Sequence, residues 1–103
     1  MKLLTKTVQK RLPAIYANEE KSAEETKVPV KFFTPWSNWT WYATEFDGQD
    51  TFFGLVVGQE AELGYFSLAE LESIKGPAGL KVERDLHWNH GTTLAQVQTQ
   101  EGR

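Results

Sequence analysis

The sequence contains no cysteine in its 103 residues. The absence of thiols excludes disulfide bonds, a cysteine nucleophile and a cysteine-based zinc finger. Long hydrophobic runs are also missing, since no stretch approaches the roughly 20 apolar residues that span a bilayer. Polar residues from Thr5 onward interrupt the Met-Lys-Leu-Leu start before an apolar signal region can form. We therefore expect a cytoplasmic protein.

Basic residues are missing from the middle of the chain. Between Lys31 and Lys75 there is no lysine or arginine, although this segment holds eleven of the thirteen aromatic residues. An aromatic surface with uncompensated negative charge repels nucleic acid and attracts proteins whose own surfaces are built to hold nucleic acid. The segment carries seven carboxylates, at Glu45, Asp47, Asp50, Glu60, Glu62, Glu70 and Glu72.

Signatures of catalysis and of cofactor binding are absent as well. No serine lies in a nucleophile elbow, and no glycine-rich loop precedes a helix as a phosphate site requires. We expect neither an enzyme nor a bound cofactor. One segment resembles a metal-ligand set, because Glu83, Asp85, His87 and His90 fall within eight positions. Acidic alternation on a solvated strand gives the same pattern, so we expect no metal there.

Apolar spacing and turn residues predict an α+β fold. The expected architecture is a small antiparallel sheet of four to five strands, with an N-terminal helix and a short helix after the fourth strand. Alternation predicts strands at residues 27–32, 38–46, 51–57, 62–66 and 82–88. Pro29 cannot donate to a ladder, which places the first strand at a sheet edge. Gly54 is expected to leave room for a tryptophan or to mark a bulge.

Capping residues predict where the helices begin and end. Apolar residues recur every four positions in residues 5–12, with Thr5 as the cap, and the helix is expected to kink or restart at Pro13, with Ile15 and Tyr16 closing it against the core. Ser67 and Glu70 form a capping-box pattern for the second helix, which Gly76-Pro77 ends. We expect one domain over residues 1–90, followed by a polar, flexible tail over residues 91–103 whose apolar groups are too few to pack.

Strict alternation along residues 38–46 divides the side chains between two faces. Trp39, Trp41, Ala43 and Glu45 are expected on one face, and Trp39 and Trp41 are expected in the core. Trp36 lies on the Thr-Pro-Trp-Ser turn and is expected to be partly exposed. An exposed tryptophan beside acidic residues is a credible anchor for a protein partner.

Several segments together resemble a short family of proteins of unknown function carried on bacterial plasmids and other mobile elements. The Trp-rich segment is the most specific, and the likeness extends to about Trp88. The segments are 1–6, 30–35, Ser37-Asn38-Trp39-Thr40-Trp41-Tyr42-Ala43-Thr44-Glu45-Phe46-Asp47-Gly48, 50–56, 62–68, Glu70-Leu71 and 82–86. The family has no established catalytic residues to carry over. One member is described as a type II-A anti-CRISPR, an inhibitor of the Cas9 effector.

The resemblance implies a non-catalytic inhibitor that binds a Cas9-type effector, with or without guide RNA. Such an effector holds nucleic acid in strongly positive channels, where an acidic ligand can compete. The expected docking surface consists of Glu45, Asp47, Asp50, Glu60 and Glu62, with Trp36 as anchor.

A competing hypothesis is an accessory protein of a mobile element that binds nucleic acid through a basic N-terminal helix. The first eleven residues carry only positive charge, at Lys2, Lys6, Lys10 and Arg11. The net charge of −3 argues against this alternative. A partner protein with a structural or toxin-neutralising role is a third possibility.

Overall fold

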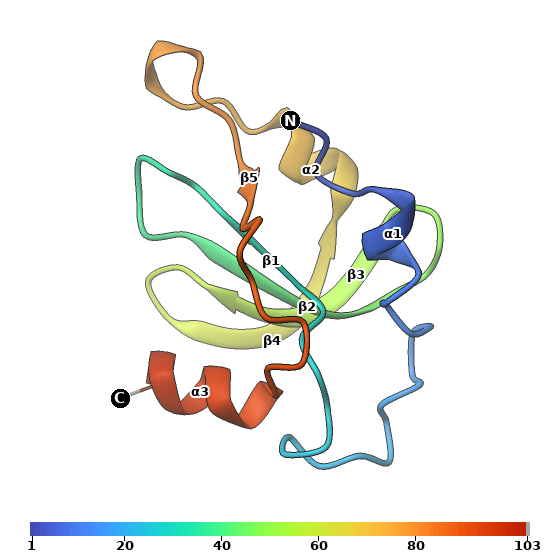
Figure 1. The fold of residues 1–103 in the computed structure, drawn as a ribbon. Helices are drawn as coiled ribbons and strands as arrows, with labels where there is room; N and C mark the ends of the chain where they lie inside the picture. Colours follow the sequence, from blue (N-terminus) through green and yellow to red (C-terminus); the bar gives the residue numbers. More distant parts are fainter. Residues whose placement is uncertain (103) are drawn as a thin grey trace.

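The computed structural model describes residues 1–102, and it has the predicted α+β fold. Five antiparallel strands form one sheet in the order β4-β3-β2-β1-β5 (Figure 1). The strands are β1 (Val30–Phe33), β2 (Thr40–Phe46), β3 (Thr51–Val57), β4 (Ala61–Ser67) and β5 (Glu83–Arg84). The helices are α1 (Lys6–Gln9), α2 (Leu68–Ser73), the 3₁₀ helix η1 (Pro77–Gly79) and α3 (Leu94–Gly102). No helix within residues 1–102 is long and apolar enough to cross a membrane.

The predicted caps start both early helices. The Thr5 hydroxyl accepts the Val8 N–H at 3.2 Å at the start of α1, and the Ser67 hydroxyl accepts the Glu70 N–H at 3.2 Å at the start of α2. These bonds satisfy N–H groups that have no partner within the helix. Helix α1 is shorter than predicted, because it ends at Gln9 and the chain turns before Pro13.

The prediction of β1 as a sheet edge is wrong. β1 lies between β2 and β5, and Phe32 and Phe33 pair with residues of β5. The Val28 N–H donates to the Thr92 carbonyl at 2.8 Å, so the C-terminal segment covers the side of β1 that Pro29 was expected to leave open. β5 is much shorter than the predicted strand over residues 82–88. A proline is tolerated here because the pairing is interrupted around it.

β2 is the central strand, and it contains a β-bulge. Ala43 pairs with Gly54 and Glu45 pairs with Phe53, so Thr44 has no partner of its own in β3. The extra residue reverses the alternation: Phe46 joins the face of Trp41 and Ala43, and Glu45 moves to the opposite face. The predicted face assignment is therefore wrong from Glu45 onward.

Gly54 lies opposite this bulge, as one of its two predicted roles required. A Cβ at position 54 would lie 1.9 Å from the Tyr42 carbonyl oxygen. The close approach of the two backbones therefore requires glycine here.

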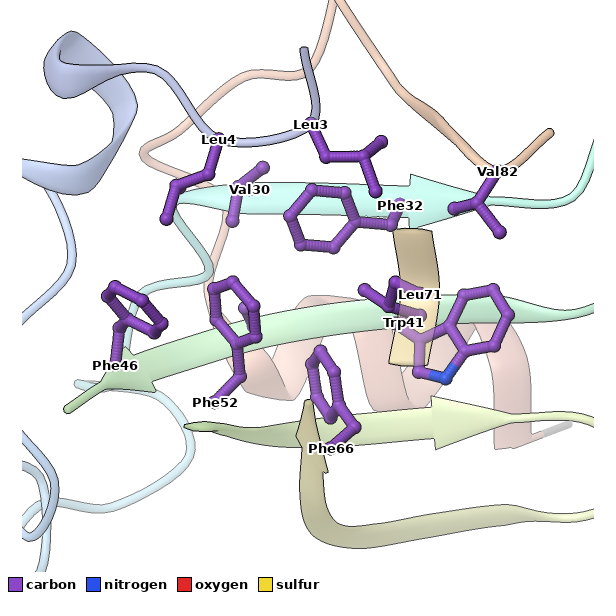
Figure 2. Packing of buried hydrophobic residues seen from close by; sticks show 11 residues of the cluster. Leu3, Leu4, Val30, Phe32, Trp41, Phe46, Phe52, Phe66, Leu71 and Val82 are labelled. Carbon is purple, nitrogen blue, oxygen red and sulfur yellow. The ribbon is translucent and has the colours of Figure 1, made fainter. Parts of the chain in front are cut away.

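Two hydrophobic cores lie on opposite faces of the sheet. Phe52 is at the centre of the first core, between Phe46 and Phe66 (Figure 2). Its ring centroid lies 4.5 Å from that of Phe46 and 5.2 Å from that of Phe66. The N-terminal segment and α2 cover this core through Leu3, Leu4 and Leu71. The second core consists of Val28, Tyr42, Leu55, Leu94 and Val97.

The C-terminal segment differs from the predicted flexible tail. Residues 94–102 form α3, which covers the second core with Leu94 and with Val97, whose side chain is 0% exposed. The Tyr42 hydroxyl donates to the Glu101 carboxylate at 2.5 Å. Two well-placed apolar residues are enough to dock one helical face, although the segment as a whole is polar. Arg103, the last residue of the predicted tail, lies outside the described residues.

Candidate functional site

The five acidic residues predicted to form one surface lie at two ends of the sheet. The β2–β3 loop at residues 47–50 and the β3–β4 turn at residues 58–60 are separated by the length of β3. Seven residues of strand span about 20 Å. The structure therefore separates Asp47 and Asp50 from Glu60 and Glu62.

Glu45 holds the N-terminal segment against the sheet. Its side chain is 5% exposed, and its carboxylate accepts the Tyr16 N–H at 2.8 Å and the Asn18 N–H at 3.3 Å. Tyr16 has a φ of 76°, in the left-handed region that residues other than glycine rarely adopt. The carboxylate thus fixes a strained turn, and Glu45 is not available to a partner.

Asp47 and Asp50 also have structural partners. One oxygen of Asp47 accepts the N–H groups of Gln49, Asp50 and Thr51 at 2.8, 2.9 and 3.0 Å. These three donors lower the pKa of the Asp47 carboxyl. The Asp50 carboxylate accepts the Ser67 hydroxyl at 2.6 Å and the Ala69 N–H at 2.8 Å, at the start of α2. Both carboxylates shape the loop and the helix that they join.

Three tryptophans line a groove at the end of the sheet that holds the β3–β4 turn. The Trp36 ring lies over Gly76 and the Trp39 ring lies over Gly58, where an added Cβ would come within 2.5 Å and 2.4 Å of the rings. Trp39 also stacks on Trp41, with 6.0 Å between ring centroids. The groove has a volume of about 370 Å³ and is lined by Thr34, Trp36, Ser37, Trp39, Trp41, Ile74 and Lys75.

The strand register places the remaining acids beside these rings. Trp41 pairs with Val56, and Val56 pairs with Glu62, so all three residues share one face of the sheet. One row further along, Trp39 lies over Gly58, whose N–H donates to the Glu60 carbonyl at 3.0 Å. Glu62 thus shares a sheet face with Trp41, and Glu60 lies in the turn over which Trp39 packs; we call Trp36, Trp39, Glu60 and Glu62 together the Trp–Glu face.

The Trp–Glu face combines aromatic area with negative charge. Glu60 and Glu62 are exposed, Trp36 is half-buried as predicted, and Trp39 is 45% exposed. The core position predicted for Trp39 is wrong, whereas Trp41 is buried as predicted, at 7% exposure. Trp39 precedes β2, where the alternation of a strand no longer determines burial, and its proximity to Gly58 depends on the register with β3. Lys75 is the basic residue that lines the groove.

The basic residues of the alternative hypothesis are all on the surface. Lys2, Lys6, Lys10 and Arg11 are exposed. Helix α1 is only four residues long, and the Arg84 guanidinium fixes the segment before it by donating to the carbonyls of Lys2 and Leu3 at 2.6 and 2.8 Å. Four exposed cations give a small phosphate-binding footprint.

Glu83, Asp85, His87 and His90, whose spacing resembles a metal-ligand set, are not brought together as one cluster. Within residues 1–102, no three His, Cys, Asp or Glu side chains lie close enough together to hold a metal ion. The Asp85 carboxylate instead accepts the His87 N–H at 2.9 Å and lies 4.0 Å from the Lys31 ammonium.

A second cavity of about 370 Å³ lies on the opposite face of the sheet from the first core. Its lining includes Tyr16, Glu45, Phe53, Leu63 and Tyr65. A hydrogen bond with the Tyr16 side chain raises the pKa of Tyr65. The cavity has the Glu45 carboxylate at its wall, and the backbone donors described above already occupy both oxygens.

Comparison with known proteins gives one relationship. No curated protein and no solved structure matches the sequence. A family model described as "Protein of unknown function (DUF2958)" matches residues 3–100, which include every strand of the sheet and the three tryptophans that line the groove. The chain belongs to the DUF2958 family.

Proposed function

We propose that the protein is an anti-CRISPR that inhibits a type II effector of the Cas9 type by binding it without catalysis. The Trp–Glu face is the observation that supports this proposal. It presents Trp39 and half-buried Trp36 next to Glu60 and Glu62, in a segment that has no lysine or arginine before Lys75. The likeness of the Trp-rich segment to a family with an anti-CRISPR member points the same way.

The chemistry of the face fits a basic protein surface. Tryptophan rings in a partly desolvated groove supply most of the binding energy at many interfaces, and acidic residues at the rim accelerate association with a positive partner. A Cas9-type effector presents such positive surfaces in the channels for the heteroduplex and the displaced strand. An inhibitor that occupies them would exclude DNA from the bacterial effector in the cytoplasm.

DNA cleavage by a purified Cas9–guide complex tests the proposal. The protein is added before or after the target DNA, at increasing amounts. We expect inhibition when it is added first and weaker inhibition when DNA is already loaded. The absence of inhibition across several type II effectors would refute the proposed function.

Two amide variants test the site. Glu60→Gln with Glu62→Gln should weaken inhibition and reduce its dependence on salt, because both changes remove charge from the Trp–Glu face. Glu20→Gln with Glu24→Gln is the matched control, since both residues are exposed on the segment before β1. Equal inhibition by the two double variants would show that the Trp–Glu face is not the docking site.

Nucleic-acid binding by the N-terminal segment is the second candidate function. The exposure of Lys2, Lys6, Lys10 and Arg11 favours it. A mobility shift of DNA by the protein alone, lost when the three lysines are replaced by glutamine, would support an accessory role. If the protein does not shift the DNA band even at low salt, nucleic-acid binding by the N-terminal segment is excluded.

A further inference from the structure

Among the described residues, β4 is an open edge of the sheet. It pairs with β3 on one side and is the last strand in the order. Ala61, Glu62, Leu63 and Tyr65 are exposed, and the side chains of Leu63 and Tyr65 are 49% and 57% exposed. Glu62 is the one charged residue of the strand. A seven-residue edge with so little charge is a template for pairing with another strand.

The ladder with β3 determines which backbone groups point outward. The Leu68 N–H donates to Asp50 at 2.8 Å, and the Gly58 N–H donates to Glu60 at 3.0 Å. Bonded and non-bonded pairs alternate in an antiparallel ladder, so the bonded pairs between these two are 52/66, 54/64 and 56/62. The even-numbered residues of β4 therefore bond β3. Residues 61, 63 and 65 direct their N–H and C=O groups away from the sheet, and residue 67 directs its N–H there, whereas its C=O accepts the first hydrogen bond of α2.

We propose that β4 pairs antiparallel with β4 of a second copy of this chain, about a two-fold axis at Gly64. Residue 63 then lies opposite residue 65, and residue 61 opposite residue 67. Every pair that forms bonds consists of two odd-numbered residues, so the outward groups of residues 61, 63 and 65 and the N–H of residue 67 face odd-numbered residues of the other strand. The product is a continuous ten-stranded sheet.

The side chains agree with this register. Leu63 of each copy lies opposite Tyr65 of the other, which joins the two exposed apolar side chains into one strip. Glu62 lies opposite Phe66, so the two Glu62 carboxylates are four residues apart along the ladder. Gly64 lies opposite itself in a non-bonded pair, where Cα atoms approach to about 4.5 Å. No atom lies within 4 Å of the place where a Cβ of Gly64 would be.

A second copy fits this edge better than a basic peptide. The strip formed by Leu63 and Tyr65, on the sheet face opposite the Trp–Glu face, is uncharged, so these two side chains give a cationic segment no charged partner. Self-pairing instead gives each apolar side chain an apolar neighbour. The two-fold axis is perpendicular to the sheet, so the dimer presents both Trp–Glu faces on the same side.

Charge exchange at position 64 tests the pairing. In Gly64→Glu and in Gly64→Lys, like charges lie directly opposite each other across the axis, which destabilises the dimer. The monomer has free space at this position. Sedimentation velocity from micromolar to near-millimolar concentration should give twice the monomer mass for the parent protein and the monomer mass for each variant alone.

An equimolar mixture of the two variants should recover the dimer mass, because a glutamate then faces a lysine. Recovery also demonstrates that both variants fold. A monomeric parent protein at every concentration would overturn the proposal, as would a mixture that stays monomeric. Leu63→Pro removes only an N–H that points away from the sheet. If the parent protein is monomeric and this variant loses effector binding, the β4 edge binds the effector instead of a second copy.

Discussion

Replacing Glu45 with glutamine separates a structural role from a docking role. The carboxylate accepts two backbone N–H groups, at 2.8 Å from Tyr16 and 3.3 Å from Asn18, and its side chain is 5% exposed. Glutamine keeps one acceptor oxygen and places an amide donor against the other N–H. A hydrogen bond to a charged group stabilises a protein by about 1.5–3 kcal/mol, and an unsatisfied donor adds a desolvation cost.

We expect Glu45→Gln to lower the free energy of unfolding by about 2–3 kcal/mol, a large share of the roughly 5–15 kcal/mol typical of a domain. The melting temperature should fall by about 8–12 °C, at roughly 4 °C per kcal/mol for a chain of this size. Urea unfolding followed by tryptophan fluorescence measures the change. Inhibition of the effector, assayed well below the melting temperature, should be unchanged because Glu45 does not reach the Trp–Glu face.

Glu60→Gln is the control for this experiment, since an exposed substitution changes stability by no more than about 0.5 kcal/mol. Glu60→Gln should have the opposite effect to Glu45→Gln: its stability should be normal, and its inhibition of the effector should be weaker. A Glu45→Gln variant that is as stable as the parent protein would refute the argument that this carboxylate fixes the Tyr16 turn. If Glu45→Gln loses inhibition without losing stability, Glu45 is part of the docking surface after all.

Three further outcomes follow from the same structure. Trp39→Ala should weaken effector binding in calorimetry, and it should also lower stability by about 0.5–1.5 kcal/mol for the lost stacking on Trp41, in addition to the lost burial of the ring; unchanged binding would exclude the ring as an anchor. Val97→Ala should cost about 2–3 kcal/mol in urea unfolding, because two methyl groups leave a fully buried site; a neutral effect would mean that α3 does not close the second core. Burial and, to a lesser extent, the Glu101 hydrogen bond raise the pKa of Tyr42 above its ordinary 10.0. Above about pH 10 the Tyr42 hydroxyl ionises in the unfolded chain but not in the folded protein, so stability should fall as the pH rises. Tyr42→Phe should flatten that fall in urea titrations at pH 8 and 11, and an equally steep fall in the variant would contradict this assignment.

The central meander could be predicted from the sequence because turn chemistry and alternation agree there. Asp47-Gly48 and the glycine at 58 mark the turns, and β3 has the predicted boundaries at Thr51 and Val57. The capping residues Thr5 and Ser67 were sufficient to place the helix starts. These signals are local, so they predict the elements without knowledge of the tertiary structure.

The errors arose where distant segments determine the outcome. The bulge at Thr44 depends on the close approach to Gly54, and alternation alone cannot count an inserted residue. The covering of β1 by residues 83–93 and the docking of α3 through Val97 depend on contacts between segments that are far apart in the sequence. A helix with two buried residues carries too weak a periodicity to stand out from a polar tail.

The candidate site was predicted in part for the same reason. Composition showed the acidic and aromatic character of residues 32–74, and the turn placed Trp36 at the surface. Which acids remain free could not be predicted, because the partners of Glu45 and Asp50 come from the N-terminal segment and from α2. The role of Trp39 depends on the register that places it over Gly58.

The second core has a kinetic consequence. It joins Val28 to Leu94 and Val97, across most of the chain, whereas the β2–β3–β4 meander is built from hairpins with short loops. Closing a long loop costs more chain entropy than closing a hairpin, so the meander and the first aromatic contacts form before α3 docks. We therefore expect helix α3 to be absent from the folding transition state. It determines how long the folded protein persists rather than how quickly it forms, because late contacts act on the rate of unfolding.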